Sequence, residues 1–392
     1  MRYETRLCAL KFALSFGISG ALAVPLLTLW GGLSLTEVFL LQTWYSVLAV
    51  AFEIPTGSIA DKIGRKKSLL LGSVLSALAC VVYVSYPAFA VFALGELLFA
   101  VGAALNSGAA EAFAYDYLKR TGRDMHSLGL FSKMRAASVI AHILALPLGT
   151  GIASLLPFPM SLRMPMFLTA LPFSIAAIVA LSMKEPELSG RGKAYLTLVR
   201  KGLTYLVRHE KLRALAIDKA SISAVAFMMF WLYQAILMKY NLHIFWFGVL
   251  AAVFNIAGVI AIGILVKAED KLGLKNTLSA TSLIIGLSYI ATSLGIVPIA
   301  VLGITVVISL KLGREPIFDH YMNRHIASET RATVLSAVSM LQRLLISLLY
   351  VVVGVLADMS LEGTLVVLGV AAMTLGLASR VREEKLGVEN SR

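Results

Sequence analysis

The chain of 392 residues is 58% hydrophobic and only 15% charged, and its mean hydropathy is +0.84. Because about a quarter of the residues of a soluble domain are charged, this composition excludes a soluble globular protein and indicates a polytopic membrane protein. The formal net charge of +13 would suggest nucleic-acid binding in a soluble protein, but the basic residues lie in short segments between long apolar stretches. They therefore indicate membrane orientation, and no nucleic-acid partner is expected.

Apolar segments long enough to cross a membrane recur along the whole chain. A helix needs roughly 20 residues to cross about 30 Å of hydrocarbon. We expect twelve such helices, at residues 8–30, 38–60, 68–85, 88–115, 128–155, 162–183, 212–238, 245–266, 276–294, 297–318, 332–357 and 361–379. An even number of spans places both termini on the same side of the membrane.

The basic residues are distributed unevenly between the two faces. Under this arrangement only Arg163 and Lys239, of the 35 Lys and Arg residues, fall near the turns of one face. The positive-inside rule makes the other face cytoplasmic, so we expect a plasma (inner) membrane protein with both termini in the cytoplasm. The first apolar run is too long for a cleaved secretory signal. The two cysteines, Cys8 and Cys80, lie in apolar segments and predict no disulfide framework, metal site or cofactor.

The turn between the second and third predicted spans is the most informative motif. It reads Gly57-Ser-Ile-Ala-Asp61-Lys-Ile-Gly64-Arg65-Lys66-Lys67. The spacing Gly-x3-Asp-Lys-x-Gly-Arg-Lys resembles the signature that joins these two helices in the major facilitator superfamily. Residues 52–57, 107–116 and 331–336 are similar to stretches of a poorly characterised prokaryotic branch often described as effluxers. The resemblance implies an all-α membrane fold of twelve transmembrane helices in two pseudo-symmetric six-helix bundles, working by alternating access.

The resemblance also implies a gate at this turn. Gly57 would let a neighbouring helix approach closely. Asp61 would accept hydrogen bonds from the start of the eleventh helix, near Arg331, and so complement its dipole.

The basic residues of the turn, Arg65 and Lys66, need acidic partners. Glu111 and Asp116, at the end of the fourth span, are the candidates. If these pairs form only when the cytoplasmic side closes, they act as a latch on the outward-open state. Alternatively, the charges only set the topology and the shape of the loop.

A second copy of the turn follows the eighth predicted span. It reads Asp270-Lys271-Leu-Gly273-Leu-Lys275 and differs from residues 61–66 only by an Ile/Leu exchange and the loss of the arginine. This repeat favours two duplicated halves. Any latch should therefore be asymmetric, with its stronger half at Asp61, Arg65 and Asp116.

One long polar interval divides the chain. We expect an N-terminal bundle at 1–184, a linker at 185–212, a C-terminal bundle at 213–380 and a tail at 381–392. Residues 195–208 space apolar residues at helical intervals among basic ones. This segment is either an amphipathic helix on the cytoplasmic leaflet or a solvated linker.

Ionisable residues inside the spans are candidates for function, because charge is costly in a bilayer. Glu96 lies eight residues into the fourth span, about 12 Å along it at 1.5 Å per residue. It is a candidate proton carrier, an attractant for a cationic substrate, or a buried group paired with a cation such as Arg343. Relatives often carry arginine here, so their arginine-linked proton role is not implied. Glu53, near Pro55, is either a second proton site or a brace for a helix kink.

Three further residues are candidates for a substrate cavity. Arg343, the one arginine that falls clearly deep in a predicted span, could bind an anionic substrate or pair with Glu96. His142 could titrate near neutral pH, or be a hydrogen-bonded packing residue. Gln234 could donate to a substrate beside an aromatic wall, or belong with its Trp and Tyr neighbours to an interfacial belt.

These features predict a secondary transporter for a small solute. Residues 146–151, Leu-Pro-Leu-Gly-Thr-Gly, partly match the proline and glycine motif of antiporters in the family. This match favours proton-coupled export of a small or drug-like compound by a monomer. A proton symporter or facilitator importing a metabolite, and a non-transporting sensor or scaffold, are the alternatives. The chain has no Walker loop, metal-ligand spacing or nucleophile elbow, so no enzyme is predicted.

Overall fold

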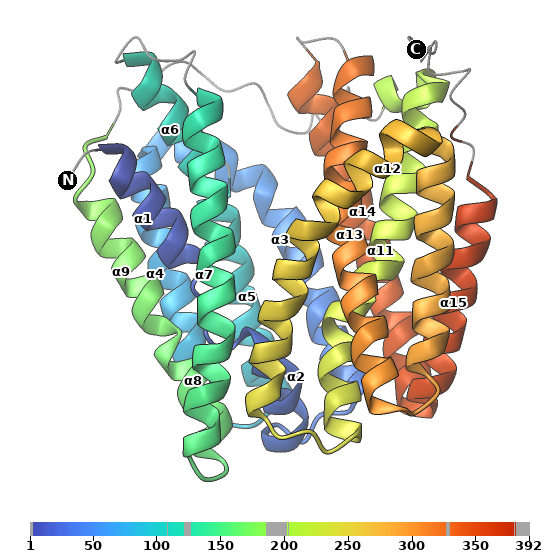
Figure 1. The fold of residues 1–392 in the computed structure, drawn as a ribbon. Coiled ribbons are helices and arrows are strands. Elements are labelled where there is room, and N and C mark those ends of the chain that lie inside the picture. Colours follow the sequence, from blue (N-terminus) through green and yellow to red (C-terminus); the bar gives the residue numbers. More distant parts are fainter. Residues whose placement is uncertain are drawn as a thin grey trace. The chain divides into compact units, whose positions relative to one another are not determined.

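The computed structural model describes residues 3–107, 109–120, 127–185, 202, 204–326, 330–379 and 381, without the side chains of residues 54–62, 120, 127, 128 and 332. Every regular element of the described residues is helical (Figure 1). The helices are α1 (Tyr3–Ser15), η1 (Gly20–Leu22), α2 (Ala23–Pro25), η2 (Leu26–Trp30), α3 (Leu35–Ile63), α4 (Arg65–Tyr83), α5 (Phe89–Asn106), α6 (Ala109–Arg120), α7 (Ser127–Leu155), α8 (Met160–Leu168), α9 (Ala170–Leu181), α11 (Glu210–Lys239), α12 (Phe245–Thr292), α13 (Val297–His325), α14 (Arg331–Met359) and α15 (Leu361–Leu377). The chain divides into two compact units: unit 1 comprises Met1–Tyr195 and Asn241–Ala252, and unit 2 comprises Leu196–Tyr240 and Val253–Arg392.

Each of the twelve predicted spans lies on a helix or on a run of short helices. Among the described residues, ten helical segments are long and apolar enough to cross a membrane, and α15 is a shorter apolar helix. One of the ten, α12, covers the eighth and ninth predicted spans. These two spans meet at Gly273, where a φ of +78° breaks the helical path. The protein is therefore an all-helical, multi-pass membrane protein.

Two predicted spans are interrupted by non-helical backbone; a third, the sixth, is divided between α8 and α9 only at Thr169, whose φ of −62° and ψ of −19° remain helical. The first is helical only to Ser15, and the chain then runs through short helical turns to Trp30. The fourth breaks between α5 and α6 at Ser107, whose ψ of 132° is extended. Asn106 and Ser107 are weak helix formers because their side chains compete for backbone hydrogen bonds. Average hydropathy does not register such a break.

Helix α7 packs closely against the break in the first span. A Cβ on Gly149 would lie 1.7 Å from the carbonyl oxygen of Ile18, and a Cβ on Gly20 would lie 2.9 Å from Cδ2 of Leu146. Small residues permit such backbone contact between membrane helices. Gly149, part of the partial antiporter motif, therefore has a packing role within unit 1.

Each unit has its own apolar core, and the two cores repeat. Leu69 and Phe113 are buried in unit 1, and Leu278 and Tyr321 are buried in unit 2, 209 and 208 residues later. The same spacing relates Gly64 to Gly273, and both have positive φ, at +98° and +78°. The sequence repeat around the two glycines thus extends to the helices that pack beside them.

The end of the predicted linker packs into unit 2. Residues 204–208 are helical, and Leu206 is buried in a core cluster with Leu212 and Val334. A Cβ on Gly202 would lie 2.5 Å from the carbonyl oxygen of Thr333. This part of the linker therefore packs one side on the core of unit 2, while residues 204 and 207–209 are exposed. Residues 186–201 and 203 lie outside the described residues.

Candidate functional site

The Gly64 turn is built around a carboxylate from the far end of unit 1. Positive φ at Gly64 lets α3 end and α4 begin at once, a conformation that favours glycine. The two oxygens of Glu185 accept the backbone N–H groups of Arg65 at 2.8 Å and Lys66 at 3.0 Å. A Cβ on Gly64 would lie 2.9 Å from the Glu185 carboxyl carbon. The carboxylate therefore caps the start of α4, where unpaired N–H groups and the helix dipole favour negative charge.

Arg65 joins this turn to α6. Its guanidinium pairs with the carboxylate of Asp116 and donates to the carbonyl oxygen of Ala112 at 2.6 Å. Glu111, the other carboxylate expected near Arg65, instead pairs with Lys11 of α1 at 3.1 Å. The assignment of Glu111 to the basic residues of the turn is therefore corrected, and the pair at the turn is Arg65–Asp116.

The other residues of the predicted gate are Gly57, Asp61 and Arg331. Gly57 and Asp61 lie in α3, and their side chains are outside the described residues. Arg331 is the exposed first residue of α14 and donates to the carbonyl oxygen of Asn323 at 3.4 Å.

The charged residues of the Gly273 turn in unit 2 lie on the surface: Asp270 and Lys271 are exposed. Also within unit 2, Lys219 of α11 pairs with Glu315 at 3.0 Å and with Asp319 of α13 at 2.7 Å. Lys219 and Asp319 lie 208 residues after Lys11 and Glu111, so this ion pair is a repeat of the one in unit 1.

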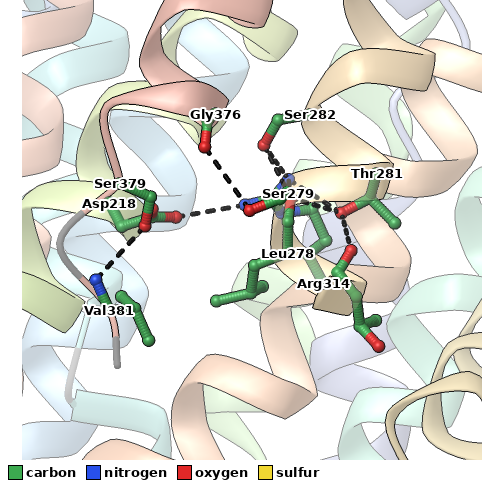
Figure 2. A network of polar contacts seen from close by, with 10 residues as sticks. Asp218, Leu278, Ser279, Thr281, Ser282, Arg314, Gly376, Ser379 and Val381 are labelled. Atoms are coloured by element: carbon green, nitrogen blue, oxygen red, sulfur yellow. Dashed lines mark hydrogen bonds and ion pairs between the residues drawn. The ribbon is translucent and has the colours of Figure 1, made fainter. Parts of the chain in front are cut away.

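Arg314 is the centre of a buried polar network in unit 2 (Figure 2). It is 1% exposed. One guanidinium nitrogen donates to Thr281 Oγ1 at 2.9 Å, Ser282 Oγ at 2.7 Å and the Leu278 carbonyl oxygen at 3.1 Å. The other donates to Asp218 Oδ1 at 3.1 Å. Helices α11, α12 and α13 are thereby joined by one side chain.

Sequence reasoning missed this network. Arg314 is almost completely buried in the protein, whereas Arg343, which was named for its depth along a predicted span, is half-buried. Arg314 and Asp218 lie near the ends of the tenth and seventh predicted spans, where a boundary error of a few residues moves a charge out of the membrane. Both residues lie a few positions inside the apolar stretch, and a charged residue in that position is the sequence feature that could have identified them.

Glu96 is held inside unit 1 by two neutral donors. It lies on α5, is 6% exposed, and its Oε1 accepts hydrogen bonds from Gln42 Nε2 of α3 at 2.9 Å and from the hydroxyl of Tyr83 of α4. Gly95 makes this possible, because a Cβ there would lie 2.4 Å from the Tyr83 ring. No ion pair joins Glu96 to a cation within the described residues of unit 1. Three helices therefore converge on one carboxyl group.

The remaining candidates differ in how deeply they are buried. His142 is exposed on α7, and its Nδ1 contacts the Ser138 carbonyl oxygen of the same helix at 2.8 Å. Gln234 is fully buried in unit 2, so its amide does not lie on a surface that a solute reaches in this structure. Glu53 is half-buried in α3.

Long apolar helices that bury ionisable groups, with an ion pair and a glycine turn repeated in two helical units, define a polytopic membrane protein built from two repeats. The family model described as Major Facilitator Superfamily matches residues 7–350. The chain belongs to this superfamily, and it is a transporter of small molecules and not an enzyme. No curated protein sequence gives a significant match.

Solved transporters share the fold. The nucleoside transporter NupG is 14% identical with a TM-score of 0.77, over 96% of this chain and 98% of its own. A POT family transporter in complex with a thioalcohol-conjugated peptide is 14% identical with a TM-score of 0.75, over 98% and 96%. A bacterial homologue of the human lysosomal transporter Spinster, inward-facing and occupied, is 15% identical with a TM-score of 0.71, over 97% of both. At these identities the likeness concerns the fold alone.

Proposed function

We propose that the chain is a proton-coupled secondary transporter that exports a small solute by antiport and that Glu96 carries the proton. The observation that carries this proposal is the burial of Glu96 between two neutral donors in the membrane-spanning part of unit 1. A carboxyl group with both hydrogen bonds on one oxygen can gain or lose a proton on the other without losing either bond. Tyr83 and Gln42 thus support both charge states, which a carrier needs.

The proposed arrangement follows the sequence. Two six-helix bundles, at 1–184 and 213–380, alternate access to a central site, and the basic face with both termini is cytoplasmic. The chain acts as a monomer in the plasma membrane. Arg65–Asp116, with Glu185 beside it, is the proposed latch, and Glu53 is the second candidate for a proton site.

Proton movement in reconstituted vesicles tests the proposal. A pH-sensitive dye inside the vesicles reports proton flux when members of a mixed solute library are added. Glu96→Gln removes the titrating group and keeps an acceptor oxygen for Tyr83 and Gln42, so we expect solute-driven proton flux to fall by about a factor of 100 or more, as expected when a proton-transfer group is removed. Solute exchange without a proton gradient should persist.

Glu37→Gln is the matched control: Glu37 is half-buried at the start of α3, and glutamine keeps an acceptor oxygen for the Ser34 N–H, so proton flux should be unchanged. If Glu96→Gln keeps normal proton flux, the role of Glu96 is disproved. Proton flux in the same direction as the solute would replace antiport by symport.

A further inference from the structure

Unit 2 carries two cations in the middle of its spanning helices. Lys311 is the fifteenth of the 29 residues of α13, and Arg343 is the thirteenth of the 29 residues of α14. Neither stretch around them, nor the matching part of α11, contains a carboxylate; the stretches are 222–238, 297–313 and 333–357. The middle of these three helices therefore has a net positive charge.

An aromatic wall adjoins Lys311. Its Nζ lies 5.2 Å from the centroid of the Phe227 ring of α11. The Phe227 ring is 6.4 Å from that of Tyr350 of α14, and Trp231 Nε1 donates to the Tyr350 hydroxyl at 3.0 Å. Because α11 packs against both α13 and α14, these side chains form one contiguous cluster, here called the Lys311 cluster: Phe227, Trp231, Lys311 and Tyr350.

The exposure of the cluster indicates which groups a solute can reach. Phe227, Trp231, Lys311 and Arg343 are all half-buried. Tyr350 is buried and holds Trp231 in place through its hydroxyl. A cation at this depth is costly against lipid, so it faces protein, water or a ligand. A half-buried lysine held over a ring face by a cation–π contact is thus oriented and accessible at once.

We propose that the Lys311 cluster, with Arg343, is a recognition site for an organic anion that has an aromatic or flat apolar body. The inference rests on the proposed transport function and names the substrate class. The ammonium of Lys311 would bind the anionic group. Arg343 lies seven residues, about two turns, before Tyr350 on the same helix α14, and would reinforce the attraction. The rings of Phe227 and Trp231 would stack on the apolar body. A cationic solute would meet two like charges and no carboxylate in the stretches 222–238, 297–313 and 333–357.

Three probes of nearly equal shape test this assignment. They are 2-naphthoate, the neutral 2-naphthamide and the cation 2-naphthylmethylammonium, each titrated calorimetrically into the purified full-length protein in detergent. We expect 2-naphthoate to bind at least about tenfold more tightly than the other two, as one charge-assisted hydrogen bond provides. Lys311→Met should remove about tenfold of that preference, and Lys311→Arg should restore most of it.

Lys239→Met is the control, because Lys239 lies at the end of α11 and pairs with Glu362. It should leave the preference unchanged, and gel filtration should show the same profile for every variant. The inference is overturned if the amide or the cation binds as tightly as the anion, if Lys311→Met keeps the preference, or if none of the probes binds at millimolar concentration. None of these results bears on proton flux through Glu96, so the transport proposal is judged separately.

Discussion

Removing Arg314 should destabilise unit 2 strongly, because its partner Asp218 would remain buried. The ion pair joins side chains that are 2% and 4% exposed. Arg314→Met fills much of the same space but leaves the Asp218 carboxylate without its cation. It also removes the hydrogen bonds that Arg314 donates to Thr281, Ser282 and Leu278. Breaking one partner of a buried ion pair costs about 3–5 kcal/mol, mainly through the uncompensated charge.

The double variant separates the charge from the packing. Asp218→Asn combined with Arg314→Met removes the uncompensated charge, so the double variant should be more stable than Arg314→Met alone by about 2 kcal/mol. The measurement is the free energy of unfolding in mixed detergent micelles titrated with dodecyl sulfate. Lys239→Met, at a half-exposed pair, should change it by less than about 1 kcal/mol. Strictly additive losses in the two single variants would refute the argument that the buried charge dominates.

Two further changes probe unit 1. Glu185→Ala deprives the start of α4 of its capping carboxylate, so the free energy of unfolding should fall by about 1–2 kcal/mol; a loss no larger than that of an exposed surface variant would contradict the capping role. Gly149→Ala should force α7 away from Ile18, where a Cβ would lie 1.7 Å from the carbonyl oxygen, and lower the melting temperature through overpacking of about 1–3 kcal/mol. Gly151→Ala is its matched control, because a Cβ there meets nothing within 4 Å, and equal effects of the two variants would disprove the packing argument.

The fold was readable from the sequence because membrane spans depend on average composition. Each predicted span falls on helix because apolar length alone decides whether a segment can cross the bilayer. The Gly64 and Gly273 turns were readable for another reason, since glycine between charged residues marks a tight turn and the second copy repeats the first. The breaks at Ser15 and Ser107 were not, because they depend on a few residues inside apolar stretches.

Side-chain partnerships were less predictable. Asp116 was one of two equivalent candidates for Arg65, and only the path of α6 decides between it and Glu111. The role of Glu185 could not be predicted from the sequence, because Glu185 lies 120 residues after Arg65, whose backbone N–H it accepts. Lys311 lies inside the tenth predicted span, but its contact with Phe227 depends on the packing of α11 against α13.

The two units repeat one ion pair and differ in the position of another. Lys11–Glu111 recurs as Lys219–Asp319, but Leu10 is replaced by Asp218 at the corresponding position 208 residues later. Unit 2 therefore has the pair Arg314–Asp218 in its core, at 2% and 4% exposure, whereas Arg65–Asp116 of unit 1 lies at the Gly64 turn and is 18% and 13% exposed.

This difference decides which pair can act as a latch. A pair that water reaches can open at little cost, because solvent stabilises the separated charges. A pair buried on all sides cannot open without leaving an uncompensated charge. We infer that Arg65–Asp116 is the pair that makes and breaks in transport, and that Arg314–Asp218 is a permanent brace. Variants that remove one charge should then have different effects. Arg65→Gln should change the transport rate more than the free energy of unfolding, and Arg314→Met should change the free energy of unfolding more than the transport rate.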